Sequence, residues 1–243
     1  MLPATILTSI FIAAWAIASE LNIIPKFMLP PPLAVFSALI KNFPDLVRHS
    51  FVTLFETFSG LAISIVLAFF VALLMDRYKP LKQAIHPFLI TTQTVPTICV
   101  APIIILFFGY GIFSKIVLVI ICCFFPITIA LFDGFSDINK DFLNLLKCMN
   151  ATYTQTLIHL KIPFALPHFF SGLKIAVTYA FISAVVAEWL GGTSGLGVYM
   201  TRVKSAYSFD KLFASIIFIS ISSFLFIKIT DSIQKKISNH FHL

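Results

Sequence analysis

The stretch "LKIPFALPHFFSGLKIAVTYAFISAVVAEWLGGTSGLG", residues 160–197, is the most informative part of the chain. Its residues 165–190 form an apolar run, and a helix of about 20 apolar residues is long enough to cross the hydrocarbon core of a bilayer. Two prolines, Pro163 and Pro167, stand near the start of the run, and a glycine-rich turn follows it. Lys174 and Glu188 are the residues of the run that carry a formal charge at neutral pH. The stretch therefore predicts a membrane-spanning helix with a polar connection at each end.

Apolar runs of this kind recur along the whole chain. The 243 residues are 59% hydrophobic and 11% charged, whereas a soluble domain carries about 25% charged residues, so a soluble surface could not be covered. We expect an all-α membrane protein with about six transmembrane helices, built as one domain over 1–243. Since no basic segment precedes the first run, we expect that run to be a retained span rather than a cleaved signal. The predicted spans are about 2–19, 52–75, 84–108, 112–132, 165–190 and 210–233.

The formal net charge of +7 is spread between the apolar runs. Scattered basic residues are typical of loops and of contacts with lipid headgroups, and no basic cluster with interleaved aromatic residues indicates nucleic-acid binding. A slight excess of basic residues places the N-terminus and the loop 76–82 inside the cell. The four cysteines form no CxxC pair, and no nucleophile–base pair or metal-ligand cluster is visible, so we expect no catalytic residue, no metal and no cofactor.

Two polar connections interrupt the spans, at 20–51 and 133–164. In the first, Pro32 suits the opening turn of a helix that we expect to run to about Asn42 and to lie on the membrane surface. In the second, we expect two short helices joined by a left-handed turn at Asn150, with Pro163 ending the second helix. These two helices are half apolar, although a loop should be polar. They therefore predict a docking surface for another protein.

Four stretches together resemble the permease subunits of bacterial binding-protein-dependent ABC importers. They are "FMLPPPLAVFSAL" (27–39), "QTVPTICVAPIIILFFGYGIFSKI" (93–116), the loop 133–164 and the stretch 160–197. The resemblance covers about 20–235 and is to the branch that carries nitrate, sulfonates, taurine and thiamine-pyrimidine precursors. It implies a type I ABC importer permease fold in the bacterial cytoplasmic (inner) membrane, and transport of a small polar solute. It also implies a homodimer, a separate ATPase subunit that hydrolyses the ATP, and an extracytoplasmic substrate-binding protein.

In the family that the chain resembles, the loop before the fifth span carries Glu-Ala-Ala and, three residues further on, Gly. That loop forms coupling helices that sit in a groove of the ATPase. Here the corresponding positions hold Asn144, Leu145 and Leu146, and then Asn150. Asparagine adopts the left-handed conformation more readily than most residues, so the turn can survive, but the carboxylate is lost. The predicted ATPase-docking residues are Leu145, Leu146, Met149, Asn150, Leu157 and Leu160.

Prolines interrupt the third and fourth predicted spans, at Pro96, Pro102 and Pro126. Proline kinks are one explanation. The other is a broken helix that lines a cavity, since irregular backbone within a membrane is tolerated where it faces a pathway. The predicted pathway residues are Gln93, Thr94, Thr97 and Glu188.

The charged residues near or within the spans leave several roles open. Glu188 belongs either to the pathway or to the structure, with Arg202 as one candidate partner, because a charge at membrane depth is costly unless it is paired or functional. We expect Glu56 at the interface and Lys174 to extend towards water. The "GGTSGLG" segment, 191–197, lacks the Lys-Ser/Thr pair of a phosphate loop and is expected to be a flexible outer connection.

Three alternatives to a coupled importer remain open at this point. A secondary transporter would need its own ion-coupling residues and often inverted repeats, and neither is visible. An intramembrane enzyme would need paired catalytic residues at one depth. A degraded permease with weakened ATPase coupling would explain the altered loop 144–150.

Overall fold

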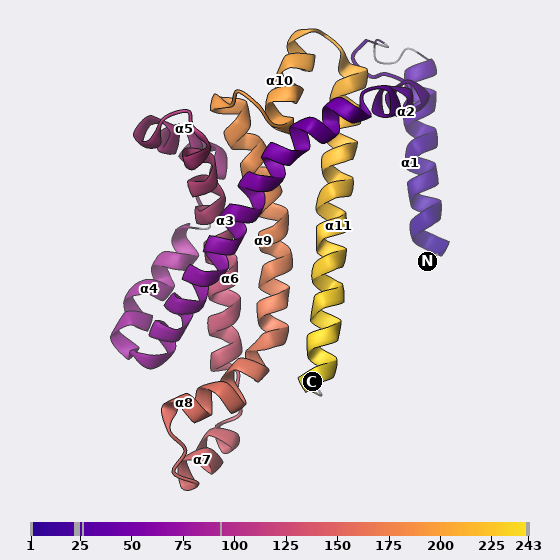
Figure 1. Ribbon diagram of the computed structural model, residues 1–243. Coiled ribbons are helices and arrows are strands. Elements are labelled where there is room, and N and C mark those ends of the chain that lie inside the picture. Colours follow the sequence, from indigo (N-terminus) through magenta and orange to yellow (C-terminus); the bar gives the residue numbers. More distant parts are fainter. Residues whose placement is uncertain (1, 22–24, 26, 93, 242–243) are drawn as a thin grey trace.

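The computed structural model describes residues 2–21, 25, 27–92 and 94–241, and every regular element in that part of the chain is a helix (Figure 1). The α-helices are α1 Leu2–Glu20, α2 Pro32–Lys41, α3 Phe43–Arg77, α4 Lys79–Thr92, α5 Thr97–Phe108, α6 Ile112–Ser136, α7 Lys140–Cys148, α8 Tyr153–Thr156, α9 Ile162–Gly191, α10 Leu196–Ser205 and α11 Phe209–Phe241. A π-helical turn, Leu157–Lys161, joins α8 to α9. In Figure 1, α2 and α10 lie at the upper end of the molecule, while α7, α8 and the end of α11 lie at the lower end.

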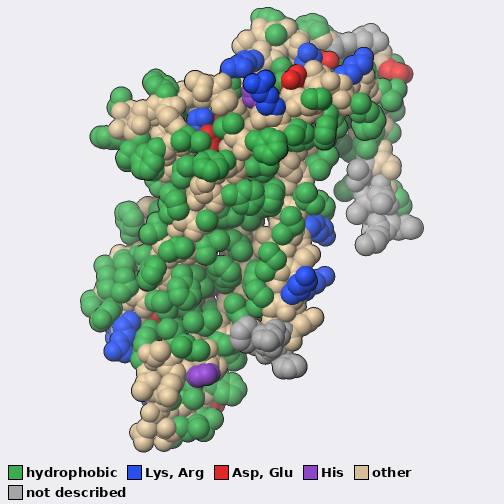
Figure 2. All heavy atoms as spheres, in the orientation of Figure 1, with side chains coloured by type: hydrophobic (Ala, Val, Ile, Leu, Met, Phe, Trp, Pro, Cys, Tyr) green, Lys and Arg blue, Asp and Glu red, His purple; other side chains and the backbone are tan. Residues whose placement is uncertain are grey.

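Four helical segments are long and apolar enough to cross a membrane. They are Phe43–Arg77, Ile112–Ser136, Tyr153–Gly191 and Phe209–Asn239. The pair α4 and α5 is a further candidate, and the first predicted span, 2–19, corresponds to α1. The face in Figure 2 is hydrophobic over most of its height, and Lys, Arg, Asp and Glu gather mainly at its upper end. The prediction of an all-α membrane protein is confirmed.

The third predicted span, 84–108, is two helices rather than one. The axes of α4 and α5 differ by 105°, across a short break that includes Gln93, which lies outside the described residues. Pro96 takes the extended conformation before α5, with φ −60° and ψ 128°. The residue before a proline is also biased away from the helical region, so "TVP" is a local reason for the helix to stop before Pro96. This arrangement is either a broken span or a re-entrant segment.

Pro163 does not end a helix, contrary to the prediction. The chain stays helical from Tyr153 to Gly191, through both Pro163 and Pro167. Pro163 stands in the first turn of α9, where a missing N–H is tolerated. The π-helical turn just before it changes the hydrogen-bond register, so the clash that a proline causes inside an uninterrupted α-helix is avoided. The second short helix of the loop 133–164 and the fifth predicted span are therefore one connected element, Tyr153–Gly191.

The centre of the fold is the packing of α6 against both α9 and α3, and α3 also contacts α9 directly. Small side chains of α9, namely Ala176, Ala180 and Ala184, are fully buried there. Gly172 lies against Ala130 so closely that a Cβ atom would leave no room. Small residues allow the close backbone approach that membrane helices use in place of a hydrophobic driving force. This tight core fixes the positions of the polar groups at both ends.

The helices α1 and α2 form an attachment at the upper end. The predicted helix from Pro32 is confirmed, and it packs against α11. The Trp15 indole N–H donates to the carbonyl of Pro30 (3.1 Å), and its ring lies 5.9 Å from that of Phe213. Buried or half-buried Trp usually finds such a partner for its N–H. The upper end of α1 is thus tied to α2 and α11.

Candidate functional site

A groove runs along α6 and α9, built from two adjoining cavities. The upper cavity, about 220 Å³, is lined by residues of α4–α6 that include Thr97 and Pro126, and by Tyr179 of α9. The lower cavity, about 370 Å³, is lined by Pro126 and Tyr179 again, and by Asp133 and His168. Because the two cavities share residues, they form one surface, which we call the α6–α9 groove. Its lining mixes apolar residues with hydroxyl groups, a carboxyl group and an imidazole.

The predicted pathway residues differ in their relation to this groove. Thr97 lines it, and its hydroxyl group lies 3.5 Å from the Cys122 thiol. Thr94 is exposed, and its hydroxyl donates to the carbonyl of Thr91 (2.7 Å). Gln93 lies outside the described residues. Glu188 lies outside the groove lining and is fully buried near the upper end.

Glu188 holds the turn that leads into α10. The Thr53 hydroxyl donates to Glu188 Oε1 (2.7 Å), and the backbone N–H of Gly197 donates to Oε2. The N–H of Leu196 donates to the Thr53 hydroxyl (2.9 Å), and that of Gly195 donates to Nδ1 of His49 (3.3 Å). Three successive N–H groups at the start of α10 are therefore bound by side chains of α3 and α9. A carboxylate suits this position because a helix N-terminus favours negative charge.

Gly195 is required at the centre of this turn. Its φ of +118° is rarely adopted by residues with side chains, and a Cβ atom there would overlap the Glu188 carboxyl group. Arg202, the suggested partner of Glu188, instead donates to the carbonyl of Thr193 (2.9 Å). That expectation is corrected: the polar partners of Glu188 are Thr53 and the backbone of the turn. The segment 191–197 was expected to be a flexible connection, but its residues 195–197 are held by hydrogen bonds to side chains of α3 and α9.

A buried ion pair adjoins Glu188. Lys115 of α6 donates to Oε1 of Glu56 on α3 at 3.0 Å, and both side chains are buried. The expectation of Glu56 at the interface is therefore corrected. A charged group is accepted inside when an opposite charge and hydrogen bonds compensate its desolvation. Since the two residues are 59 positions apart, no local pattern indicates the pair.

The lower end carries an ordered helical hairpin outside the central packing. The Asn139 side chain accepts from the N–H of Asp141 (2.9 Å) at the start of α7, and Thr152 and Gln155 form a capping box at the start of α8. Asn150 has φ +54°, which confirms the predicted left-handed turn. The N–H groups of Asn150 and Ala151 donate to the carbonyls of Lys147 and Leu146 (3.0 and 2.9 Å), as in a Schellman motif.

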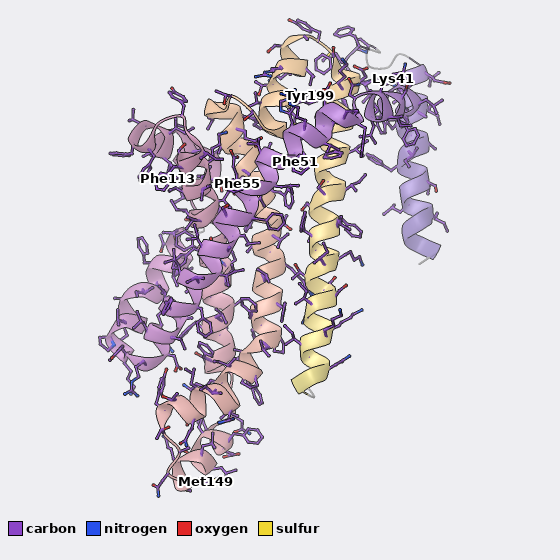
Figure 3. All side chains as sticks on the ribbon, viewed as in Figure 1. Lys41, Phe51, Phe55, Phe113, Met149 and Tyr199 are labelled. Atoms are coloured by element: carbon purple, nitrogen blue, oxygen red, sulfur yellow. The ribbon has the colours of Figure 1, made fainter. Side chains whose placement is uncertain are left out.

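This hairpin presents an apolar face to its surroundings. Leu145, Met149 and Ile158 are 57%, 69% and 52% exposed, and Met149 lies at the lower tip of the molecule (Figure 3). We call these three residues the exposed hairpin face. Of the other predicted docking residues, Asn150 is exposed, while Leu146, Leu157 and Leu160 are half-buried. Ile158 is missing from the predicted set, although its apolar character beside Leu157 is visible in the sequence.

Polar contacts fasten the hairpin to the lower end of α3. Lys161 donates to both oxygens of Asp76 (2.6 and 2.8 Å), and the Tyr153 hydroxyl donates to Asp76 Oδ2 (3.0 Å). The Arg77 guanidinium lies 4.5 Å from the centre of the Tyr153 ring, a cation–π distance. A force on the hairpin is therefore passed directly to α3 as well as to α9.

Lys174 is paired as well. Its Nζ lies 2.6 Å from Oδ1 of Asp231 on α11, and both side chains are about one-third exposed. The expectation of a lysine extending alone towards water is therefore incomplete, because a carboxylate of the neighbouring helix meets it. Among the described residues, no group of three or more His, Cys, Asp and Glu side chains could hold a metal ion.

Comparisons with known proteins agree with this architecture. Residues 60–242 match the family described as binding-protein-dependent transport system inner membrane component. A probable ABC transporter permease protein of Haemophilus influenzae is 34% identical over 230 residues, covering 94% of each chain. The formylaminopyrimidine transport permease protein ThiX of Halalkalibacterium halodurans is 36% identical over 225 residues, covering 92% of this chain and 90% of the relative.

Solved structures show the same fold. The MetNI methionine ABC transporter in an inward-facing conformation matches with a TM-score of 0.69 at 19% identity, covering 79% of this chain and 95% of the other. At that identity the likeness concerns the fold, which is that of type I ABC importer permeases. The family match spans three quarters of the sequence, and the two relatives match over nearly all of it. This chain belongs to the inner-membrane permease family of binding-protein-dependent ABC transport systems.

Proposed function

We propose that this permease works as a homodimer in the bacterial inner membrane and imports a small polar solute through the α6–α9 groove. The family implies two kinds of partner, an ATPase subunit and a substrate-binding protein. The groove is open along one side, where Ile175 and Tyr179 are about half exposed. A second copy of the chain would cover that side and close the groove into a path.

The exposed hairpin face carries the proposal of ATPase docking. Leu145 and Met149 belong to the capped helix α7 and its C-terminal end, and Ile158 to the π-helical turn after α8. The slight excess of basic residues predicts that this end faces the cytoplasm. An apolar surface on an ordered element is typical of a protein interface. The left-handed turn at Asn150 supports retained coupling, because the backbone keeps its course without the family's glycine.

The lining of the groove favours a neutral or cationic solute over an anion. Asp133 contributes a carboxyl group, His168 an imidazole, and Thr97 and Tyr179 hydroxyl groups, while no Lys or Arg lies among the described lining residues. A sulfonate or nitrate ion would meet a like charge at Asp133, with no Lys or Arg among the described lining residues to bind the ion, and like-charge contacts are penalised. Together with the similarity to ThiX, this favours an aminopyrimidine such as a thiamine precursor.

Uptake into proteoliposomes tests the proposed function. The permease, its ATPase and its binding protein would be reconstituted, with ATP inside or absent and radiolabelled formylaminopyrimidine or taurine outside. We expect ATP-dependent accumulation of the pyrimidine and little of taurine. Asp133→Lys should lower pyrimidine uptake, whereas Asp231→Lys, outside the groove, should change it little. Accumulation of taurine alone would contradict the solute class but keep the importer, and accumulation without ATP would contradict the ATP-driven mechanism.

A further inference from the structure

The buried cluster at the upper end contains one more acid than base. Glu56 is 0% exposed, Glu188 is 1% exposed and Lys115 is 4% exposed. They come from α3, α9 and α6, so the cluster joins three helices of the central packing. If both acids were ionised, the cluster would hold a net negative charge shielded from water. An uncompensated buried charge is strongly disfavoured, and a carboxyl group in that situation usually binds a proton instead.

Hydrogen bonding distinguishes the two carboxyl groups. Both oxygens of Glu188 accept hydrogen bonds, one from the Thr53 hydroxyl and one from the Gly197 N–H. Oε1 of Glu56 accepts from Lys115, but Oε2 is the one buried side-chain oxygen or nitrogen of the described residues that lacks a partner. Donors stabilise the ionised form of a carboxyl group. Glu188 is therefore the better anion, and Glu56 has the free position for a proton.

The Glu56 and Glu188 carboxyl groups lie in the same buried cluster, because Glu56 is one helical turn from Thr53, whose hydroxyl binds Glu188. Two ionised carboxylates in such a cluster could only accept hydrogen bonds and would repel each other, which disfavours ionisation of both. A proton on Oε2 of Glu56 changes the contact into a donor–acceptor pair. It also gives the unpartnered oxygen a role and leaves the ammonium of Lys115 balanced by the carboxylate of Glu188.

We propose that Glu56 and Glu188 form a buried proton-binding site, in which Glu56 carries the proton on Oε2 and donates it to Glu188. The remaining charged and titratable groups nearby are already engaged. Lys115 of α6 binds Oε1 of Glu56, His49 of α3 accepts from Gly195 through Nδ1, and Arg202 of α10 donates to the carbonyl of Thr193. None of these contacts supplies a donor to Oε2 of Glu56.

The site connects proton binding to the upper end of the molecule. Glu188 accepts from the turn 195–197, and Thr53, one helical turn from Glu56 on α3, donates to Glu188. Separation of α3 from α9 and α10 would break the contacts of Thr53 with both Glu188 and Leu196. Loss of the proton would place two anions side by side and favour that separation. The proton is therefore a stabilising element of the closed upper end.

Infrared spectroscopy of the full-length permease in lipid tests this directly, because a protonated carboxyl group has a carbonyl band distinct from that of a carboxylate. At neutral pH we expect that band in the native protein. We expect its loss in Glu56→Gln, which removes the acid. It should also disappear in Glu188→Gln, because Glu56 would then ionise beside Lys115. Asp231→Asn, which alters a partly exposed carboxylate outside the cluster, should leave the band unchanged.

Two results would overturn the proton-binding site. One is a native protein without the band, and the other is a band that survives in both glutamine variants. Thermal unfolding gives an independent readout, because the side-chain amide introduced by Glu56→Gln can donate to Glu188 as the acid does. Glu56→Gln should therefore unfold close to the native temperature. A variant that fails to fold while Asp231→Asn folds normally would show that Glu56 acts as an anion, which also contradicts the proposal.

Discussion

The two ends of this permease invert the usual placement of polar and apolar side chains. At the upper end, Glu56, Lys115 and Glu188 come from three helices and are buried, and Lys115 pairs with Glu56. At the lower end, Leu145 and Met149 project from an ordered hairpin and are more than half exposed. The upper cluster finds its partners within the chain. The exposed hairpin face is not covered by the described residues, which is the reason for proposing a partner protein there.

Substitutions at the two ends should therefore change different free energies, that of folding at one end and that of association at the other. Removal of Lys115, the base of the upper cluster, leaves a charge without its partner and should affect folding of the permease itself. A change on the exposed hairpin face should leave the fold intact and affect association. Unfolding assays should therefore detect changes at the upper end, and co-purification with the ATPase should detect changes at the exposed hairpin face.

The largest expected effect is at the buried ion pair. Lys115→Met leaves Glu56 and Glu188 without their cation, and loss of one partner of a buried pair costs about 3–5 kcal/mol. Lys174→Met is the matched control, because its pair with Asp231 is about one-third exposed and such pairs contribute about 1 kcal/mol or less. Unfolding of both variants in the same detergent measures the difference. If Lys115→Met and Lys174→Met lost equal amounts of stability, burial of the Lys115 pair would not make its loss more costly.

The next effect is at the exposed hairpin face. Burial of a leucine side chain contributes about 1.5–3 kcal/mol, and 1.4 kcal/mol is tenfold in affinity, so Leu145→Asp should weaken ATPase binding about tenfold or more. Asn144→Asp adds the same charge to the neighbouring exposed residue of α7 and should have less effect. Binding of purified ATPase to each variant is the measurement. A similar loss in both variants would point to charge rather than to apolar docking.

The turn into α10 should respond more moderately. Gly195→Ala forces a side chain into a left-handed position against Glu188, and strain of this kind costs about 1–3 kcal/mol. Gly111→Ala is the control, because no atom lies within 4 Å of the added Cβ. Thermal unfolding should separate the two variants. If Gly195→Ala is as stable as Gly111→Ala, the turn is not held as described.

The smallest effect is expected at the hairpin turn. Asn150 already has φ +54°, so Asn150→Gly should change the free energy of unfolding by about 0.5 kcal/mol or less and leave ATPase binding intact. Asn150→Val is the informative contrast, because a β-branched residue is a true outlier at positive φ. Greatly improved ATPase binding by Asn150→Gly would indicate that asparagine had weakened coupling.

Features set by nearby residues were predictable from the sequence. Long apolar runs identify membrane helices because the bilayer requires them, and Asn150 takes the left-handed turn for reasons contained in its own side chain. Pro163 was misjudged because proline usually breaks a helix, and nothing in the sequence marks the π-helical turn that accommodates it.

Features set by distant residues were not predictable. Glu56 and Lys115 are 59 positions apart and Thr53 and Glu188 are 135 apart, so only the folded packing of α3, α6 and α9 reveals their contacts. One local signal was present: Thr53 and Glu56 are polar residues three positions apart at the start of the mainly apolar part of α3, and so share one face. That spacing marks the buried polar face of α3.

The most direct test of the docking surface uses a cysteine that the chain already has. Cys148 is exposed and lies three residues after Leu145 on α7, whereas Cys122 and Cys123 are half-buried and buried. With Cys99 replaced by serine, a maleimide would react mainly at position 148. We expect rapid labelling of the permease alone and strongly slowed labelling of the complex purified through its ATPase subunit. Equal labelling rates in the two samples would contradict the assignment of this hairpin as the site where the ATPase binds.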